Sequence, residues 1–197
     1  MISLTEKERE TLLILFKDFT GYYNANSISK VLRISHVGAQ KIFKRLQKEN
    51  LIIGRQIGKS IIYKLNMGDD YACRLIAFLL LDEANSKFKR WLEEFRELFK
   101  KDRMVILFGS TLKNYAAAND IDVMIVIDKK DYKEVKNVLD KKRQILPKKI
   151  HSIELTEEDL KKNIKKMHEP IVDAIKNGIV LCGHEKYVEV IKNAASF

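Results

Sequence analysis

The chain has 197 residues and a net charge of +10 at pH 7, with 46% hydrophobic and 32% charged residues. This length allows one large domain or two small ones, and the composition is typical of a globular protein. No apolar run approaches the ~20 residues of a membrane-spanning helix, and the charged N-terminal residues do not form a signal peptide. We therefore predict a cytoplasmic protein without a membrane partner, in which Cys73 and Cys182 are free thiols.

The positive charge is concentrated in the first third of the chain. Residues 1–68 contain 12 Lys and Arg against 5 Asp and Glu, whereas residues 69–197 contain 25 against 22. A basic segment joined to a nearly neutral one favours a polyanion as the partner of the first part. A lysine-rich solvated surface would have the same composition, so charge alone does not decide between the two.

Three helical segments are predicted at the start of the chain. Residues 4–17 have apolar side chains at helical spacing, and Thr5 with Glu8 has the pattern of a capping box. A short helix is expected over residues 27–32, and a longer one within residues 34–51. Because only a few residues separate these last two helices, the pattern predicts a helix-turn-helix.

Two β-branched runs, residues 51–53 and 60–65, flank the sequence GRQIGK and predict a hairpin with a basic tip. Residues 4–66 thereby resemble the winged helix-turn-helix of transcription regulators. The resemblance implies double-stranded DNA as the partner, with the third helix in the major groove and the hairpin, or wing, on the backbone or minor groove. The residues expected to contact DNA are His36, Gln40, Lys41, Lys44 and Arg45 on the helix, and Arg55, Gln56 and Lys59 on the wing. A protein-binding winged helix remains the alternative.

The rest of the chain is predicted as a helical linker, residues 69–100, and a small α/β domain, residues 101–197, after a winged-helix domain of residues 1–68. The fold class is thus α/β (α+β) with two domains, the second containing a small mixed sheet. Strands are expected at 103–108, 120–127, 148–155 and 179–183, and helices at 70–85, 86–100, 130–146, 156–178 and 184–193.

Residues 107–128 read LFGSTLKNYAAANDIDVMIVID and contain the pattern that is most informative about function. Gly109 allows the backbone to approach a phosphate closely, and Ser110 offers a hydroxyl and an amide to it. Residues two apart on a strand face the same side, so Asp120 and Asp122 converge on one spot. Two such carboxylates beside a phosphate are suitable ligands for Mg²⁺.

Gly-Ser followed by Asp-Ile-Asp, each tied to a strand, resembles the DNA polymerase β-like nucleotidyltransferase superfamily, and residues 100–195 resemble its minimal prokaryotic members. The resemblance implies that Gly109 and Ser110 bind a nucleoside triphosphate and that Asp120 and Asp122 hold Mg²⁺ or Mn²⁺. Lys113 stands near the position where the family commonly has Arg, and we expect it to neutralise phosphate as a point charge.

Active members of that superfamily have a third carboxylate on a later strand. Glu154 is the only acid of the strand 148–155 that can take this catalytic role beside Asp120 and Asp122. If the register places His151 or Ile153 there instead, the acceptor hydroxyl lacks its carboxylate base, and nucleotide binding can persist without transfer.

Three functions are therefore compatible with the sequence. The favoured one is a DNA-binding transcriptional regulator whose nucleotidyltransferase-like domain binds Mg-nucleotide. The alternative is an active, antitoxin-like nucleotidyltransferase that moves a nucleotide to a protein or small molecule, with the winged helix serving autoregulation. The third is an interaction module for a protein partner. Regulators of this kind usually bind palindromic sites as dimers, so we also expect a homodimer, with the apolar helix 71–81 as one candidate interface.

Overall fold

The computed structural model describes residues 2–195 and divides them into two compact units, one ending at Leu79 and the other running from Leu80 to Ala195. The division lies inside the long helix α4 (Asp70–Lys87), so the segment expected as a separate linker, residues 69–100, belongs partly to each unit. Within the described part of the chain, no helix combines the length and the apolar character needed to cross a bilayer.

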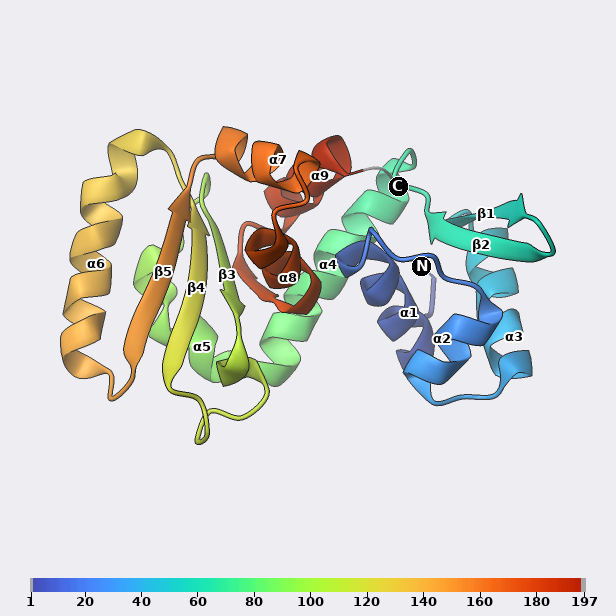
Figure 1. Ribbon diagram of the computed structural model, residues 1–197, viewed down its shortest axis with the longest axis horizontal. Helices are drawn as coiled ribbons and strands as arrows, with labels where there is room; N and C mark the ends of the chain where they lie inside the picture. The colour runs from blue at the N-terminus through green and yellow to red at the C-terminus, as the bar shows by residue number, and fades with distance from the viewer. Residues whose placement is uncertain (1, 196–197) are drawn as a thin grey trace. The chain divides into compact units, whose positions relative to one another are not determined.

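Before α4 begins, the first unit contains three helices and a two-stranded antiparallel hairpin (Figure 1). Its elements are α1 (Glu6–Lys17), α2 (Ala25–Leu32), α3 (His36–Lys48), β1 (Ile52–Ile57) and β2 (Ser60–Leu65). The winged helix-turn-helix fold predicted for this part is confirmed by this order of elements. The turn between α2 and α3 is short because Arg33 ends α2 in the left-handed conformation and Ser35 caps α3 through the amide of Gly38.

The hairpin differs from the predicted one in the length of its tip. GRQIGK was expected as a loop, but β1 continues through Arg55 and Gln56 as far as Ile57. Only Gly58 and Lys59 form the turn. Two-residue turns with a residue in the left-handed region match the twist of paired strands, which explains why the ladder extends so far.

The second unit is built around a four-stranded mixed sheet with the strand order β5-β4-β3-β6, in which β4 and β5 are parallel and the other pairs antiparallel. Its strands are β3 (Met104–Phe108), β4 (Asp120–Val126), β5 (Lys149–Leu155) and β6 (Ile179–Cys182). Its helices are α5 (Lys89–Glu94), α6 (Tyr132–Ile145), α7 (Glu157–Lys165), α8 (Glu169–Asn177) and α9 (His184–Ala194), with short 3₁₀ turns at Arg96–Leu98, Ser110–Leu112 and Lys129–Asp131. This confirms the predicted mixed-sheet fold.

Strands β3 and β4 are largely buried on both faces of this sheet, which is why they read as nearly continuous apolar runs. One face packs on Trp91 of α5, on Phe95 just after it, and on Val135 and Leu139 of α6. Helices α7, α8 and α9 lie on the other side of the sheet (Figure 1). The start of β4 reaches the end of this second face, where two aspartates replace apolar residues.

One predicted helix is divided in two. Residues 156–178 were expected to form a single helix, but α7 ends at Lys165 and α8 begins at Glu169. Met167 between them has a φ of 53°, and Pro170 occupies the first turn of α8. Proline is favoured at the start of a helix and breaks one from within, so the break follows from its position.

Candidate functional site

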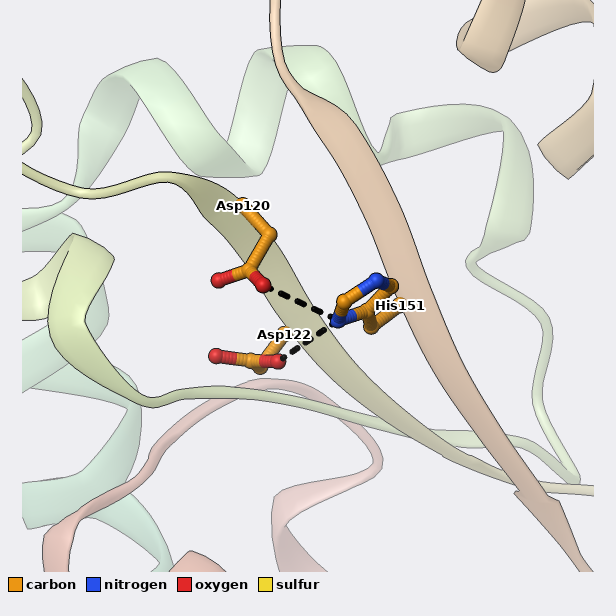
Figure 2. Close-up of side chains that lie close together, drawn as sticks. All are labelled: Asp120, Asp122 and His151. Atoms are coloured by element: carbon orange, nitrogen blue, oxygen red, sulfur yellow. Dashed lines mark ion pairs between the residues drawn. The ribbon is translucent and has the colours of Figure 1, made fainter.

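Asp120 and Asp122 lie next to each other on the same face at the start of β4, as the spacing predicts (Figure 2). Their side chains are 29% and 22% exposed, so both carboxylates are held at the surface of the domain with one side open to solvent. Burial raises the pKa of Asp122, and repulsion from Asp120 raises it further, while attraction to His151 partly offsets both effects. This pair of carboxylates therefore favours a cation beside it.

His151 occupies the third corner of the cluster. Its Nδ1 atom lies 3.0 Å from Oδ2 of Asp120 and 3.8 Å from Oδ1 of Asp122, and its ring points between the two carboxylates (Figure 2). The parallel register between β4 and β5 pairs Asp122 with His151 and Asp120 with Lys149. Paired residues on adjacent strands share a face, so this register places the imidazole at the site.

Glu154, the acid expected to complete the site, is not brought there. The register pairs Glu154 with Ile125, which points into the core on the opposite face of the sheet. Ser152 has the same orientation as Glu154 and accepts a hydrogen bond from Nη2 of Arg143 on α6 at 3.0 Å. Since register decides which residues face the site, the alternative with His151 is the one that the structure contains.

Gly109 lies against Asp122, one member of the acidic pair. It has a φ of 81°, and a Cβ atom built on it would lie 2.0 Å from Oδ2 of Asp122. Only glycine therefore leaves room for this carboxylate where β3 ends. Besides the close approach to phosphate that the sequence predicts, Gly109 makes space for a candidate metal ligand.

Ser110 and Lys113, the other predicted nucleotide-binding residues, are exposed just after Gly109. The helix start expected at Ser110 is only a three-residue 3₁₀ turn, Ser110–Leu112. Such a turn has no helix dipole of useful size, so anion binding here depends on the backbone amides and on the side chains themselves.

The loop leading to Asp120 is held by residues that sequence reasoning missed. Oγ1 of Thr111 donates to the carbonyl of Asp120 at 2.6 Å, and Nζ of Lys148 donates to the carbonyls of Ala116, at 3.4 Å, and of Ala118. The Lys148 ammonium also lies 4.9 Å from the ring centre of Tyr115. Lys148 stands just before β5, so it joins this loop to the strand that carries His151.

The cluster has donors that fit a divalent cation. One ligand atom from each of Asp120, Asp122 and His151 lies within 4.8 Å of the others, and carboxylate oxygens and imidazole nitrogens are ordinary metal ligands. Because Gly109 has no side chain, the carboxylate of Asp122 has room to occupy this position.

In the first unit, four of the predicted DNA contacts lie on one exposed surface of α3. These residues are His36, Gln40, Lys41 and Lys44. The opposite side of the helix carries Ala39, Phe43 and Leu46, which are fully buried. The helical period alone separates these two faces. We call the four exposed residues the α3 surface.

Arg45 is engaged elsewhere. Its Nη1 atom donates to both carboxylate oxygens of Glu8 at 3.0 Å, and Nη2 donates to the carbonyl of Ser3. Glu8 is buried and forms the capping box of α1 with Thr5. The guanidinium therefore neutralises a buried carboxylate, and we remove Arg45 from the set expected to contact DNA.

The wing residues Arg55, Gln56 and Lys59 are exposed. Arg55 and Gln56 stand on β1, whereas Lys59 stands in the turn at the tip. Nε2 of Gln56 donates to the carbonyl of Gly58 at 2.7 Å, which fixes this side chain along the hairpin. Arg55 and Lys59 thus supply exposed positive charge on the wing.

The small mixed sheet with two aspartates beside a Gly-Ser turn agrees with the resemblance to nucleotidyltransferases that the sequence shows. A family model described as nucleotidyltransferase domain matches residues 88–191, more than half of the chain. The chain therefore belongs to the nucleotidyltransferase domain family.

Solved structures also match parts of the chain. The adhesin competence repressor AdcR from Streptococcus pyogenes is 20% identical, with 47% of this chain and 69% of that chain covered and a TM-score of 0.36. A mutant of ZitR from Lactococcus lactis is 20% identical, with 49% and 61% covered and a TM-score of 0.35. No curated protein matches this chain.

Proposed function

We propose that this protein is a cytoplasmic, DNA-binding transcriptional regulator whose nucleotidyltransferase domain binds a nucleoside triphosphate together with a divalent cation. The observation that carries the proposal is the third corner of the acidic cluster, which holds His151 where the resemblance to active superfamily members implies a carboxylate. This arrangement favours binding over transfer. The winged helix-turn-helix would then bind DNA and carry out the regulation.

The DNA part of the proposal is supported by the α3 surface and the wing. Lys41 and Lys44 are exposed on the helix that follows the turn of the helix-turn-helix, where major-groove contacts are made. The amide of Gln40 can pair with adenine, and lysines can contact guanine or phosphate. Arg55 and Lys59 are suited to phosphate contacts on either side of the groove.

The nucleotide part is supported by the family and by the geometry around Gly109. In this domain, Asp120 and Asp122 would hold the cation, and the backbone after Gly109 would meet the phosphates with Ser110 and Lys113. When bound, the cation supplies positive charge against the triphosphate oxygens.

Transfer needs a group that accepts the proton of the attacking hydroxyl. Among the described residues, the cluster of potential ligand groups consists of Asp120, Asp122 and His151, without a third carboxylate. The alternative function, an active nucleotidyltransferase, is supported by one observation. The imidazole of His151 is 61% exposed beside the two carboxylates, where a neutral ring can act as a general base.

A labelling experiment tests the nucleotide proposal. The full chain is incubated with Mg²⁺ or Mn²⁺ and each α-labelled nucleoside triphosphate, and both equilibrium binding and label transfer to protein are measured. We expect binding without transfer, and loss of binding in the double variant Asp120→Asn/Asp122→Asn. Asp128→Asn is the matched control, because Asp128 follows β4 and pairs with Lys130 in a solvent-exposed contact. Transfer that is lost in the double variant would establish the alternative function instead.

Selection of a binding site from random double-stranded DNA tests the regulator proposal. The affinity for the selected site should fall steeply with salt, because Lys and Arg contacts displace counterions. The double variant Lys41→Ala/Lys44→Ala should bind more weakly, whereas Lys101→Ala, which removes an exposed charge from the second unit, should not. An affinity independent of salt would rule out this interface. Repeating the measurement with metal and nucleotide shows whether the ligand changes the affinity for DNA.

We also propose that the protein acts as a homodimer through α4. Tyr71 and Phe78 lie seven residues apart on this helix and are 50% and 56% exposed, so they form an apolar stripe on one face. Sedimentation should give the mass of a dimer for the natural chain and of a monomer for Phe78→Glu. A stable protein partner that copurifies with a chain binding neither DNA nor nucleotide would favour the interaction module.

A further inference from the structure

The donor set of the candidate metal site is unusual in one respect. Two of its three groups are carboxylates, and the third is the Nδ1 atom of His151. On the face of β5 that carries His151, the register aligns Lys149 with Asp120 and Ile153 with Met124. No acid of β5 can therefore reach the cation in place of His151 without a shift of the strand by an odd number of residues.

An imidazole changes which cation fits the site. Mg²⁺ requires oxygen ligands in near-octahedral geometry and gives up its water reluctantly. First-row transition ions accept imidazole readily and bind nitrogen-containing sites more tightly along the order from Mn²⁺ to Cu²⁺. A site with one nitrogen donor among its three protein ligands thus discriminates against Mg²⁺.

The charge of the donor set points to a single ion. Asp120 and Asp122 together carry two negative charges, which balance one divalent cation, whereas a third carboxylate would favour a second cation beside the first. His151 donates without adding negative charge, and the neighbouring Lys149, which the register places on the same face, adds a positive one.

We propose that His151 is the third ligand of a single metal ion and that it makes the site select a transition metal ion, probed here as Mn²⁺, over Mg²⁺. The inference rests on the proposed function in one respect, since Asp120 and Asp122 are taken as metal ligands. It deepens that function because it names the residue that decides which metal accompanies the nucleotide.

Metal binding is measured on the full chain at fixed pH without nucleotide, by electron paramagnetic resonance for Mn²⁺ and by calorimetry for Mg²⁺. The natural chain should bind Mn²⁺ at least tenfold more tightly than Mg²⁺. His151→Asp should lower this preference about tenfold by restoring an all-oxygen set, and His151→Ala should weaken Mn²⁺ binding with little effect on Mg²⁺. His168→Ala is the matched control, because His168 is exposed at the start of α8 without a side-chain capping bond.

A spectroscopic measurement separates a ligand from a residue that only shapes the site. Pulsed paramagnetic resonance of the Mn²⁺ complex should show coupling to a directly bound nitrogen in the natural chain and in His168→Ala, and none in His151→Asp. Fluorescence of the single tryptophan, Trp91, verifies that each variant is folded. An unchanged metal preference in His151→Asp, an absence of nitrogen coupling in the natural chain, or Mn²⁺ binding that persists in Asp120→Asn would each overturn the inference.

A separate nucleotide titration distinguishes failure of the proposed function from failure of this inference. A chain that binds Mn²⁺ through His151 but no nucleoside triphosphate would retain the inference and refute nucleotide binding. A chain that binds nucleotide equally with Mg²⁺ and Mn²⁺, without nitrogen coupling, would retain the proposed function and refute the inference.

Discussion

The two candidate sites of this protein are built in different ways. The α3 surface in the first unit comes from one helix, whose period separates exposed polar residues from the buried Phe43 and Leu46. The site in the second unit comes from three segments that meet only in the folded sheet, namely the end of β3, the start of β4 and the start of β5. Local sequence determines the first site, and strand register determines the second.

This difference predicts how each site responds to substitution. On the α3 surface, each side chain projects into solvent, so removal of one residue should weaken DNA binding without affecting the fold. In the second unit, Gly109 and Asp122 pack against each other, so a change in one displaces the other. The predictions below test this contrast, beginning with the largest effect.

Gly109→Ala should have the largest effect. The added Cβ would meet the carboxylate of Asp122, and the backbone has a conformation that L residues rarely adopt. We expect a loss of roughly 3 kcal/mol in the free energy of unfolding of the second unit, together with loss of metal binding. Urea unfolding followed by Trp91 fluorescence measures the free energy of unfolding, and calorimetry measures metal binding.

Gly58→Ala is the matched control in the first unit. Gly58 also has a positive φ, of 58°, but its missing Cβ would meet nothing within 4 Å. The left-handed conformation alone should cost about 1–2 kcal/mol. Equal losses for the two substitutions would mean that the contact between Gly109 and Asp122 contributes nothing.

Arg45→Ala should have the next largest effect on the free energy of unfolding. It leaves the carboxylate of Glu8 buried, with Thr5 as its remaining partner among the described residues, and such a loss costs about 1–3 kcal/mol. Since the guanidinium is 43% exposed, the lower half of this range is expected. Unfolding of the first unit followed by circular dichroism measures the change. An unchanged stability combined with weaker DNA binding would return Arg45 to the DNA-contacting residues.

Lys44→Ala should leave stability unchanged, because its side chain is exposed on the α3 surface. It should weaken DNA binding and lower the slope of log K against log salt by about 1, the effect of one lost phosphate contact. Fluorescence anisotropy with the selected DNA at several salt concentrations gives this slope. Comparison with Arg45→Ala separates the two neighbouring cations by function.

The sequence allowed more to be predicted in the first unit than in the second. The capping box of α1, the helix-turn-helix and the exposed residues of α3 all follow from patterns within a few residues. The ion pair of Arg45 could not be predicted, because its partner, Glu8, lies 37 residues away in the sequence. The predicted loop at the tip of the wing was too long. GRQIGK contains two glycines, but of these only Gly58 lies in the turn.

In the second unit, Gly109, Asp120 and Asp122 could be found because their spacing is local. The choice between His151 and Glu154 could not be made this way, since it depends on how β5 aligns with β4. One signal did exist. Ile150 is apolar between the polar Lys149 and His151, which indicates that these two residues face away from the core at the start of the strand.

Asp122→Asn should have a small effect on stability, in the opposite direction to Gly109→Ala and Arg45→Ala. The pKa of Asp122 is raised in the folded protein, so its ionised form is less favourable there than in the unfolded chain. At neutral pH without metal, the neutral amide should therefore give a slightly higher melting temperature than the natural residue. As the pH falls through the raised pKa of the folded state, Asp122 takes up a proton and the advantage of the amide should disappear. Thermal unfolding of both chains between pH 7 and about pH 4 with a chelator present measures this difference. A lower melting temperature for Asp122→Asn at neutral pH would contradict this prediction. It would show that His151 already stabilises the ionised carboxylate of Asp122, so that the metal site of the second unit is formed before a cation binds.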